Sequence, residues 1–136
     1  MQRKYVTRGN GTQLLERDLT DQIIAAAIEV HKALGPGLLE SAYQLCMAHE
    51  SKLRKLSFEQ QVPLKVNYKG LELDGGYRLD FVYNHRVVVE LKTVESVLPV
   101  HEAQLLTYLK LTGIRVGLPI NFYVPLLKSG IYRRVL

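Results

Sequence analysis

Two neighbouring apolar segments constrain the fold more than any other feature of the chain. The sequence YRLDFVY, residues 77–83, is followed after a short polar stretch by RVVVELK, residues 86–92. Both segments are rich in β-branched and aromatic residues, which predicts two strands joined as an antiparallel hairpin. The odd-numbered side chains of both strands are all apolar, from Tyr77 onward, so that face of the hairpin is expected to pack against a core.

The length of the connecting loop decides which side chains face each other on the second face. A two-residue loop would put Asp80 and Glu90 on opposite faces of the hairpin. A three-residue loop over residues 84–86 pairs residue 83 with residue 87 and sets Asp80 directly across from Glu90. We expect this second register, in which Lys92 shares the face of the two carboxylates.

Facing carboxylates are unfavourable unless a positive charge lies between or beside them. At a Cβ separation of about 5 Å, their repulsion is on the order of 3 kcal/mol at an effective dielectric constant near 20. Lys92 offsets part of this repulsion, and two carboxylates beside a lysine also suit a hard cation such as Mg²⁺ or Mn²⁺. Spacing alone leaves two alternatives equally open, a metal site and a solvated face of salt bridges.

The other segments predict a mixed α/β domain, in which helices flank a hairpin-rich sheet. Thr20 is suited to cap the first helix, with Leu19 and Ile24 as a hydrophobic staple, and GPG at residues 35–37 is suited to end it. Pro63 is tolerated in an edge strand, and Gly75 with Gly76 interrupts the strand that follows. The expected helices span residues 21–34, 38–55 and 100–111, and the expected strands span 58–68, 71–83, 86–92, 115–121 and 131–136.

Length and composition indicate one folded domain. The chain of 136 residues suffices for one hydrophobic core, so residues 1–136 are expected to form a single domain with residues 1–18 as an irregular N-terminal arm. Hydrophobic residues make up 47% and charged residues 23%, which argues against disorder. The single cysteine, Cys46, excludes an internal disulfide and a cluster of thiolate metal ligands.

Charge favours a phosphate-bearing partner, and hydropathy argues against a membrane span or a signal peptide. Eighteen Lys and Arg against thirteen Asp and Glu give a net charge of +5, which favours partners that carry phosphates. No uncharged run approaches the roughly 18 residues of a membrane span. The basic N-terminal MQRKYVTRGNG lacks the apolar segment of a signal peptide, so we expect a cytoplasmic protein that does not bind a membrane.

Four motifs in order resemble a family of nucleases. GLLESAY at residues 37–43 matches the motif of the GxxExxY family, and Asp80 followed by ELK at residues 90–92 matches the D…(D/E)xK signature of the PD-(D/E)XK nuclease superfamily. Gln104 and Tyr108 match the QxxxY helix of RecB-like members. The resemblance runs from about Leu19 to the C-terminus and implies a restriction-endonuclease-like core with a mixed sheet flanked by helices.

The resemblance also implies a role for each matching residue. Asp80 and Glu90 would bind Mg²⁺ or Mn²⁺ together with the Leu91 carbonyl, and Glu40 would be a further metal or water ligand. Lys92 would position the attacking water and stabilise charge on the scissile phosphate. Gln104 and Tyr108, four residues apart on one helical face, would orient Lys92 and the phosphate, with His101 on the same face.

Each of these residues also has a structural interpretation. Glu40 is favourable near a helix N-terminus through the helix dipole, Tyr43 is suited to core packing, and Gln104 is suited to an ordinary surface position. The basic residues expected to contact phosphates are Lys4, Arg8, Arg78, Lys128, Arg133 and Arg134.

Two functions of different classes follow from the sequence. The first is a metal-dependent phosphodiesterase that cleaves nucleic acid, with DNA as the expected substrate. The second is a catalytically silent module with a nuclease fold that binds nucleic acid or a protein partner. Intact Asp80, Glu90 and Lys92 favour the first, because a binding module has no need for two carboxylates beside the charge of DNA.

Overall fold

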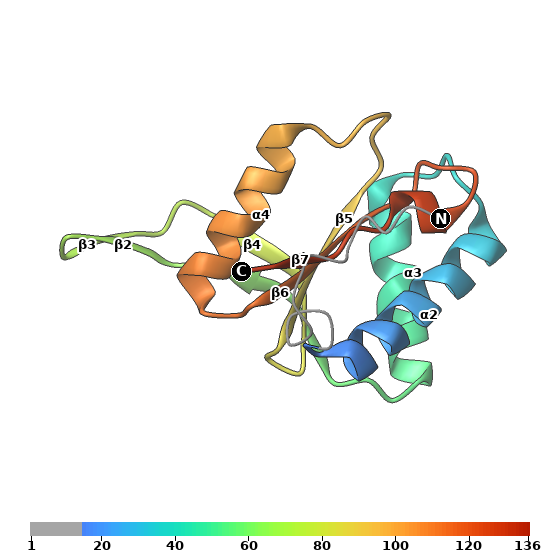
Figure 1. The fold of residues 1–136 in the computed structure, drawn as a ribbon, viewed down its shortest axis with the longest axis horizontal. Coiled ribbons are helices and arrows are strands. Elements are labelled where there is room, and N and C mark those ends of the chain that lie inside the picture. Colours follow the sequence, from blue (N-terminus) through green and yellow to red (C-terminus); the bar gives the residue numbers. More distant parts are fainter. Residues whose placement is uncertain (1–14) are drawn as a thin grey trace.

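A five-stranded sheet lies between two layers of helices in the computed structural model, which describes residues 15–136 (Figure 1). Helices α2 (Arg17–Leu34) and α3 (Glu40–Leu53) cover one face of the sheet, and α4 (Pro99–Thr112) covers the other. None of the described helices combines the length and the apolar character needed to cross a bilayer.

The sheet is mixed, as predicted. Its strands lie in the order β1 (Phe58–Pro63), β4 (Arg78–Tyr83), β5 (Val87–Lys92), β6 (Val116–Asn121) and β7 (Arg134–Val135). Only β5 and β6 are parallel, and α4 forms the crossover that a parallel connection requires. The predicted crossover helix at residues 100–111 is therefore confirmed, with its ends one residue further out on each side.

The predicted hairpin register is also confirmed. Tyr83 pairs with Val87 and Phe81 pairs with Val89, so Asp80 and Glu90 come next to each other along the same ladder. Phe81, Tyr83, Val87, Val89 and Leu91 are fully buried in the core beneath α2 and α3. The even-numbered face points toward α4, as alternation along a strand requires.

Several predicted boundaries are wrong, each for a local reason. Helix α2 begins four residues earlier than expected, and Thr20 is not its cap but lies inside it, where its hydroxyl donates to the Arg17 carbonyl over 3.1 Å. Residues 17 and 18 of the expected irregular arm are therefore helical, and residues 1–14 lie outside the described part. Helix α3 is also shorter than the expected range of 38–55.

The C-terminal strand is much shorter than predicted, because its neighbour contains a proline. Pro119 lies in the middle of β6 and has no N–H, although its carbonyl accepts a hydrogen bond from the Tyr132 amide over 3.1 Å. Pairing is reduced to an isolated bridge between Ile120 and Ile131 and to the two residues of β7.

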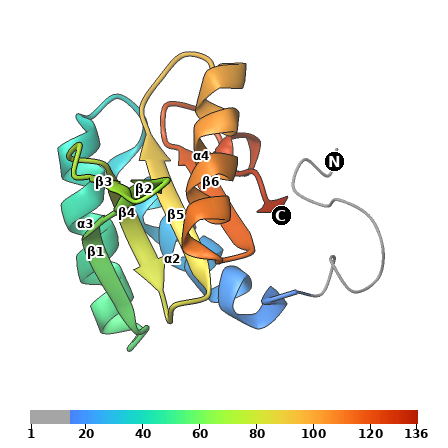
Figure 2. The same cartoon turned by 90° about the vertical axis from the view of Figure 1, so that its left-hand side faces the viewer.

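The predicted strands 58–68 and 71–83 are each broken in two. Their inner ends form a separate two-stranded hairpin, β2 (Val66–Tyr68) and β3 (Leu71–Leu73), that projects away from the main sheet (Figure 1). The view in Figure 2 looks along this hairpin and places it beside α4, in front of β4 and β5. The hairpin therefore rises from the same face of the sheet as α4.

A close backbone approach near the end of β6 yields a test of the fold. A Cβ atom on Gly130 would lie 2.1 Å from the Asn121 carbonyl oxygen, so Gly130→Ala requires the backbone itself to move. We expect a loss of about 3 kcal/mol or more in the free energy of unfolding, measured by urea denaturation. Gly117→Ala is the control, because its nearest atoms belong to the movable Leu105 side chain at 3.1 Å. Equal losses in both variants would contradict this packing.

Candidate metal centre and nuclease site

Asp80 and Glu90 are held across the hairpin by two crossed hydrogen bonds. The Asp80 amide donates to Glu90 Oε2 over 2.9 Å, and the Leu91 amide donates to Asp80 Oδ2 over 2.8 Å. Each carboxylate thus accepts a backbone hydrogen bond from the opposite strand at the end of the β4–β5 ladder. The two side chains are fixed on one face and face each other, as the register predicts.

This arrangement suits a hard divalent cation. Each carboxylate commits one oxygen to a backbone amide, so Asp80 Oδ1 and Glu90 Oε1 form no hydrogen bond within the described part of the chain. Carboxylate and carbonyl oxygens are the ligands that Mg²⁺ and Mn²⁺ prefer. The donor set therefore fits the cation that the sequence motif implies, through two side-chain ligands.

Burial makes the charged form of Glu90 unfavourable when the protein stands alone. Burial first, and then the charge of Asp80 and of Glu40, raise the pKa of Glu90 to about 8, against the hydrogen bond from the Asp80 amide and the charge of Lys92. A positive ion between the carboxylates would reverse this effect, because opposite charge stabilises the ionised form.

Lys92 ends β5 on the same face and is half-buried. Within residues 15–136, its ammonium group forms no hydrogen bond and no ion pair within 4 Å, although its charge lowers the pKa of Glu90. Lys92 therefore does not form the close salt bridge with the carboxylates that the structural interpretation requires, and its three donors are available to another group.

Glu40 approaches the carboxylates from the other helical layer. It is the first residue of α3, and partial burial and then the Asp80 charge raise its pKa, whereas Lys92 and a hydrogen bond from Gln44 lower it. Across the described residues, however, no three His, Cys, Asp or Glu side chains lie close enough together to hold a metal ion. Glu40 thus acts on the pair electrostatically without completing a three-ligand group.

Tyr43 fixes the loop that leads to Glu40. Its side chain is fully buried and stacks on Phe122, with ring centroids 4.5 Å apart. Its hydroxyl donates to the Gly35 carbonyl and accepts from the Leu38 amide, so it holds both ends of the GPG turn. Gly37 has a φ of 101°, which favours glycine. The core interpretation of Tyr43 is therefore confirmed.

Helix α4 brings its predicted residues to the carboxylates. Glu90, Lys92, Gln104 and Tyr108 line one small pocket between β5 and α4. Tyr108 is buried, and burial first and then the charges of Glu90, Tyr77 and Asp80 raise its pKa. Gln104 is exposed, one turn before Tyr108.

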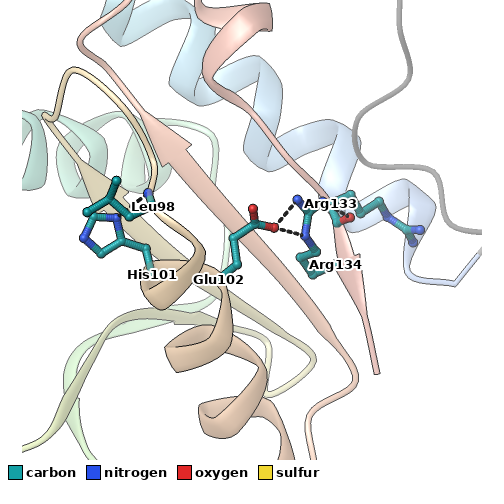
Figure 3. Close-up of polar contacts among 5 residues, drawn as sticks. All are labelled: Leu98, His101, Glu102, Arg133 and Arg134. Atoms are coloured by element: carbon teal, nitrogen blue, oxygen red, sulfur yellow. Dashed lines mark hydrogen bonds and ion pairs between the residues drawn. The ribbon is translucent and has the colours of Figure 1, made fainter.

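The first turn of α4 has structural contacts of its own (Figure 3). His101 Nδ1 accepts a hydrogen bond from the Leu98 amide over 3.0 Å, which closes the helix N-terminus. Glu102 points toward Arg134 of β7, whose Nε donates to it over 2.8 Å. His101 therefore caps α4, and Glu102 anchors it to the sheet through Arg134.

The predicted phosphate-binding residues differ in exposure and in the face of the sheet on which they lie. Arg78 and Lys128 are exposed, but Lys128 lies in the short helix η1 (Leu127–Gly130), which packs with α2 on the face opposite the carboxylates. Arg133 is 3% exposed, so its assignment to a phosphate-binding surface is wrong. Arg134 is half-buried in its ion pair with Glu102, so its charge serves the fold. Lys4 and Arg8 lie outside the described residues.

Asn121 is a site-supporting residue that the sequence did not single out. It is buried at the end of β6, opposite Lys92 in the parallel ladder. Its Oδ1 accepts from the amides of Val94 and Tyr123 over 3.2 and 3.1 Å, and its Nδ2 donates to the Val94 carbonyl over 2.8 Å. These bonds fix the chain that leaves Lys92. The sequence signal for this role is that Asn121 is the polar last residue of the otherwise apolar strand VGLPIN.

The raised pKa of Glu90 predicts how stability depends on pH without divalent ions. The neutral form is favoured in the fold, so its contribution is complete below about 4.5 and is lost as pH rises toward about 8. We expect the free energy of unfolding to fall across this window in EDTA, and Glu90→Gln to flatten the fall, in urea denaturation at several pH values. The exposed Glu72→Gln is the control, and an unchanged slope in Glu90→Gln would refute the assignment.

Comparison with known proteins agrees with this geometry. The family model of the PD-(D/E)XK nuclease superfamily matches residues 17–135. No curated protein and no solved structure matches the chain significantly. The match covers the sheet, the three helices and the Asp80–Glu90 pair, and it shows that the chain belongs to the PD-(D/E)XK nuclease superfamily.

Proposed function

We propose that the chain is a metal-dependent nuclease that hydrolyses phosphodiester bonds of nucleic acid, with DNA as the expected substrate. The observation that carries the proposal is the pair Asp80 and Glu90, held face to face by backbone hydrogen bonds beside Lys92, whose ammonium has no partner among residues 15–136. Within residues 15–136 the facing carboxylates form no close ion pair, and carboxylates without a counter-charge destabilise a fold, so their presence supports a role in binding a cation.

The metal ligands would come mainly from β4 and β5. Asp80 and Glu90 would each supply the oxygen that is not bonded to a backbone amide, and the Leu91 carbonyl would supply a third. Glu40, whose charge is felt at both carboxylates, would bind the ion through a water molecule. The bound Mg²⁺ or Mn²⁺ would lower the pKa of a coordinated water and neutralise charge on the phosphate.

The chain's other residues would handle the water and the phosphate. Lys92 would donate to the attacking water and to the phosphate oxygens, since its ammonium forms no hydrogen bond or ion pair within residues 15–136. Gln104 and Tyr108 would orient Lys92 and the phosphate, because they line the same small pocket as Lys92. Placement by a crossover helix would keep these groups fixed relative to the sheet.

We also propose that the chain belongs to the GxxExxY group within the superfamily. The separate roles of the three motif residues support this proposal. Gly37 permits the turn, Tyr43 holds the turn by hydrogen bonds, and Glu40 faces the carboxylates. The motif then has one physical purpose, which is to hold a carboxylate at the end of the sheet from the opposite layer.

The first test of the proposed function is metal binding. We expect Mg²⁺ and Mn²⁺ to raise the melting temperature in a concentration-dependent way, because a ligand of the native state stabilises it by mass action. Glu90→Gln, which keeps the shape and one acceptor oxygen, should remove most of the rise measured by scanning fluorimetry. Glu72→Gln on the exposed β3 should retain it. Wild-type melting that does not respond to millimolar Mg²⁺ or Mn²⁺ would argue for a silent module.

The second test separates catalysis from metal binding. Lys92→Ala should keep the metal-dependent rise in melting temperature and lose cleavage by about 10²-fold or more, because it removes stabilisation that acts mainly in the transition state. Cleavage is measured on labelled single- and double-stranded DNA and RNA of equal length. Lys110→Ala, an exposed lysine on α4, is the control. Wild-type cleavage in Lys92→Ala would exclude its proposed role.

A further inference from the structure

The β2–β3 hairpin carries an apolar face that nothing in the described chain covers. Cross-strand pairing places Val66 opposite Leu73 and Tyr68 opposite Leu71, so these four side chains share one face. Tyr68 and Leu71 are each 60% exposed, and Leu73 is 42% exposed. The other face carries polar residues, including Asn67 and Glu72. Exposed apolar residues gathered in this way indicate an interaction surface.

The hairpin is also too small to be ordered by its own bonds alone. Strands of three residues in a separate two-stranded sheet are marginally stable in water. Its base is anchored, because Leu64 is buried in the apolar cluster beneath α4 and its amide donates to the Tyr77 carbonyl over 2.9 Å. The anchored base and the uncovered tip fit an arm that holds something outside the domain.

The arm begins beside the catalytic face. The hairpin and α4 rise from the same side of the sheet (Figures 1 and 2). Asp80 and Glu90 lie on this side by alternation with Val82 and Val88, which pack against α4. Tyr77 links β3 to β4 and is 47% exposed, which corrects its expected place in the core. Tyr77 directly precedes β4, three residues before Asp80, on the segment that leads from the arm into the sheet. A bound polymer that extends from the carboxylates can thus reach Tyr77 first and the β2–β3 arm next.

The charged residues around the arm favour a partner that carries phosphates. The exposed cations of the arm and its base are Lys65, Lys69 and Arg78, against Glu72 and Asp74. The Lys69 ammonium lies 5.3 Å from the centroid of the exposed Tyr68 ring, so positive charge accompanies the aromatic group of the arm. Aromatic rings flanked by cations provide the stacking and the phosphate contacts by which proteins hold unpaired nucleotides.

We infer that the β2–β3 arm, together with Tyr77 and Arg78, binds single-stranded nucleic acid as it leaves the carboxylate site. Tyr68 and Tyr77 stack on unpaired bases, Leu71 and Leu73 extend the apolar contact, and Lys69 and Arg78 contact phosphates. Duplex DNA buries its bases in the helical stack and offers these rings no partner. The inference deepens the proposed nuclease function, because it assigns the substrate a single-stranded segment next to the cleavage site.

Binding without cleavage tests the arm. In the 136-residue chain with Lys92→Ala and Mg²⁺, we measure the fluorescence anisotropy of a labelled oligothymidylate and of a duplex of equal length. Adding Tyr68→Ala or Tyr77→Ala should weaken single-strand binding by about tenfold, the effect of losing one stacked base, and should change duplex binding little. Tyr123→Ala is the matched control, since Tyr123 is 46% exposed just beyond β6. Lys69→Ala should reduce the salt dependence of binding.

Three outcomes would contradict the inference that the arm binds single strands, and each can be distinguished from failure of the proposed nuclease function. The inference fails if Tyr68→Ala binds single strands like Tyr123→Ala, or if both tyrosine variants weaken duplex binding equally. It also fails if sedimentation shows a wild-type dimer that Tyr68→Ala dissociates, because the apolar face then covers a second copy. If the wild type cleaves nothing while the arm variants still lose single-strand binding, the nuclease proposal is wrong and the inference about the arm is retained.

Discussion

The site depends on two hydrogen bonds between the strands, one from the Asp80 amide to the Glu90 carboxylate and one from the Leu91 amide to the Asp80 carboxylate. At this point of the β4–β5 ladder, each strand's amide is satisfied by a carboxylate of the other strand. Backbone amides of buried strands must find acceptors, so the two acidic side chains serve the sheet as well as the chemistry. Their geometry is consequently tied to the register of the hairpin, and a slip of one residue would destroy both.

Three further contacts hold the neighbouring elements to this pair. Tyr43 closes the turn before Glu40, Asn121 clamps the chain after Lys92, and Arg134 bonds Glu102 at the start of α4. The Asn121 and Arg134 contacts join segments distant in sequence, whereas the Tyr43 contact closes a local turn. Groups that act together on one substrate need this kind of support, because small displacements of a catalytic group are costly.

The sequence predicted the parts of the fold that follow from periodicity. The alternation in residues 77–92 indicated the register, and the GPG turn indicated the end of α2, because both depend on local rules. Tertiary geometry decided the rest. The amphipathic pattern of residues 66–73 fits a strand in the main sheet equally well, and only the separation of β2 and β3 reveals that its apolar face is uncovered. Burial of Arg133 and the clamp by Asn121 likewise depend on chain segments that meet only after folding.

Electrostatics explain why such a site is stable enough to exist and still responsive to a cation. Two ionised carboxylates in this position would repel each other, and burial favours a neutral Glu90, whose pKa of about 8 lets it keep its proton at neutral pH. The protonated pair avoids the repulsion that facing charges would impose on the hairpin. A divalent ion offers the opposite solution, because it stabilises both ionised carboxylates and displaces the proton. Protonation and the proposed metal binding would thus compete for the same two side chains, and either one would remove the repulsion.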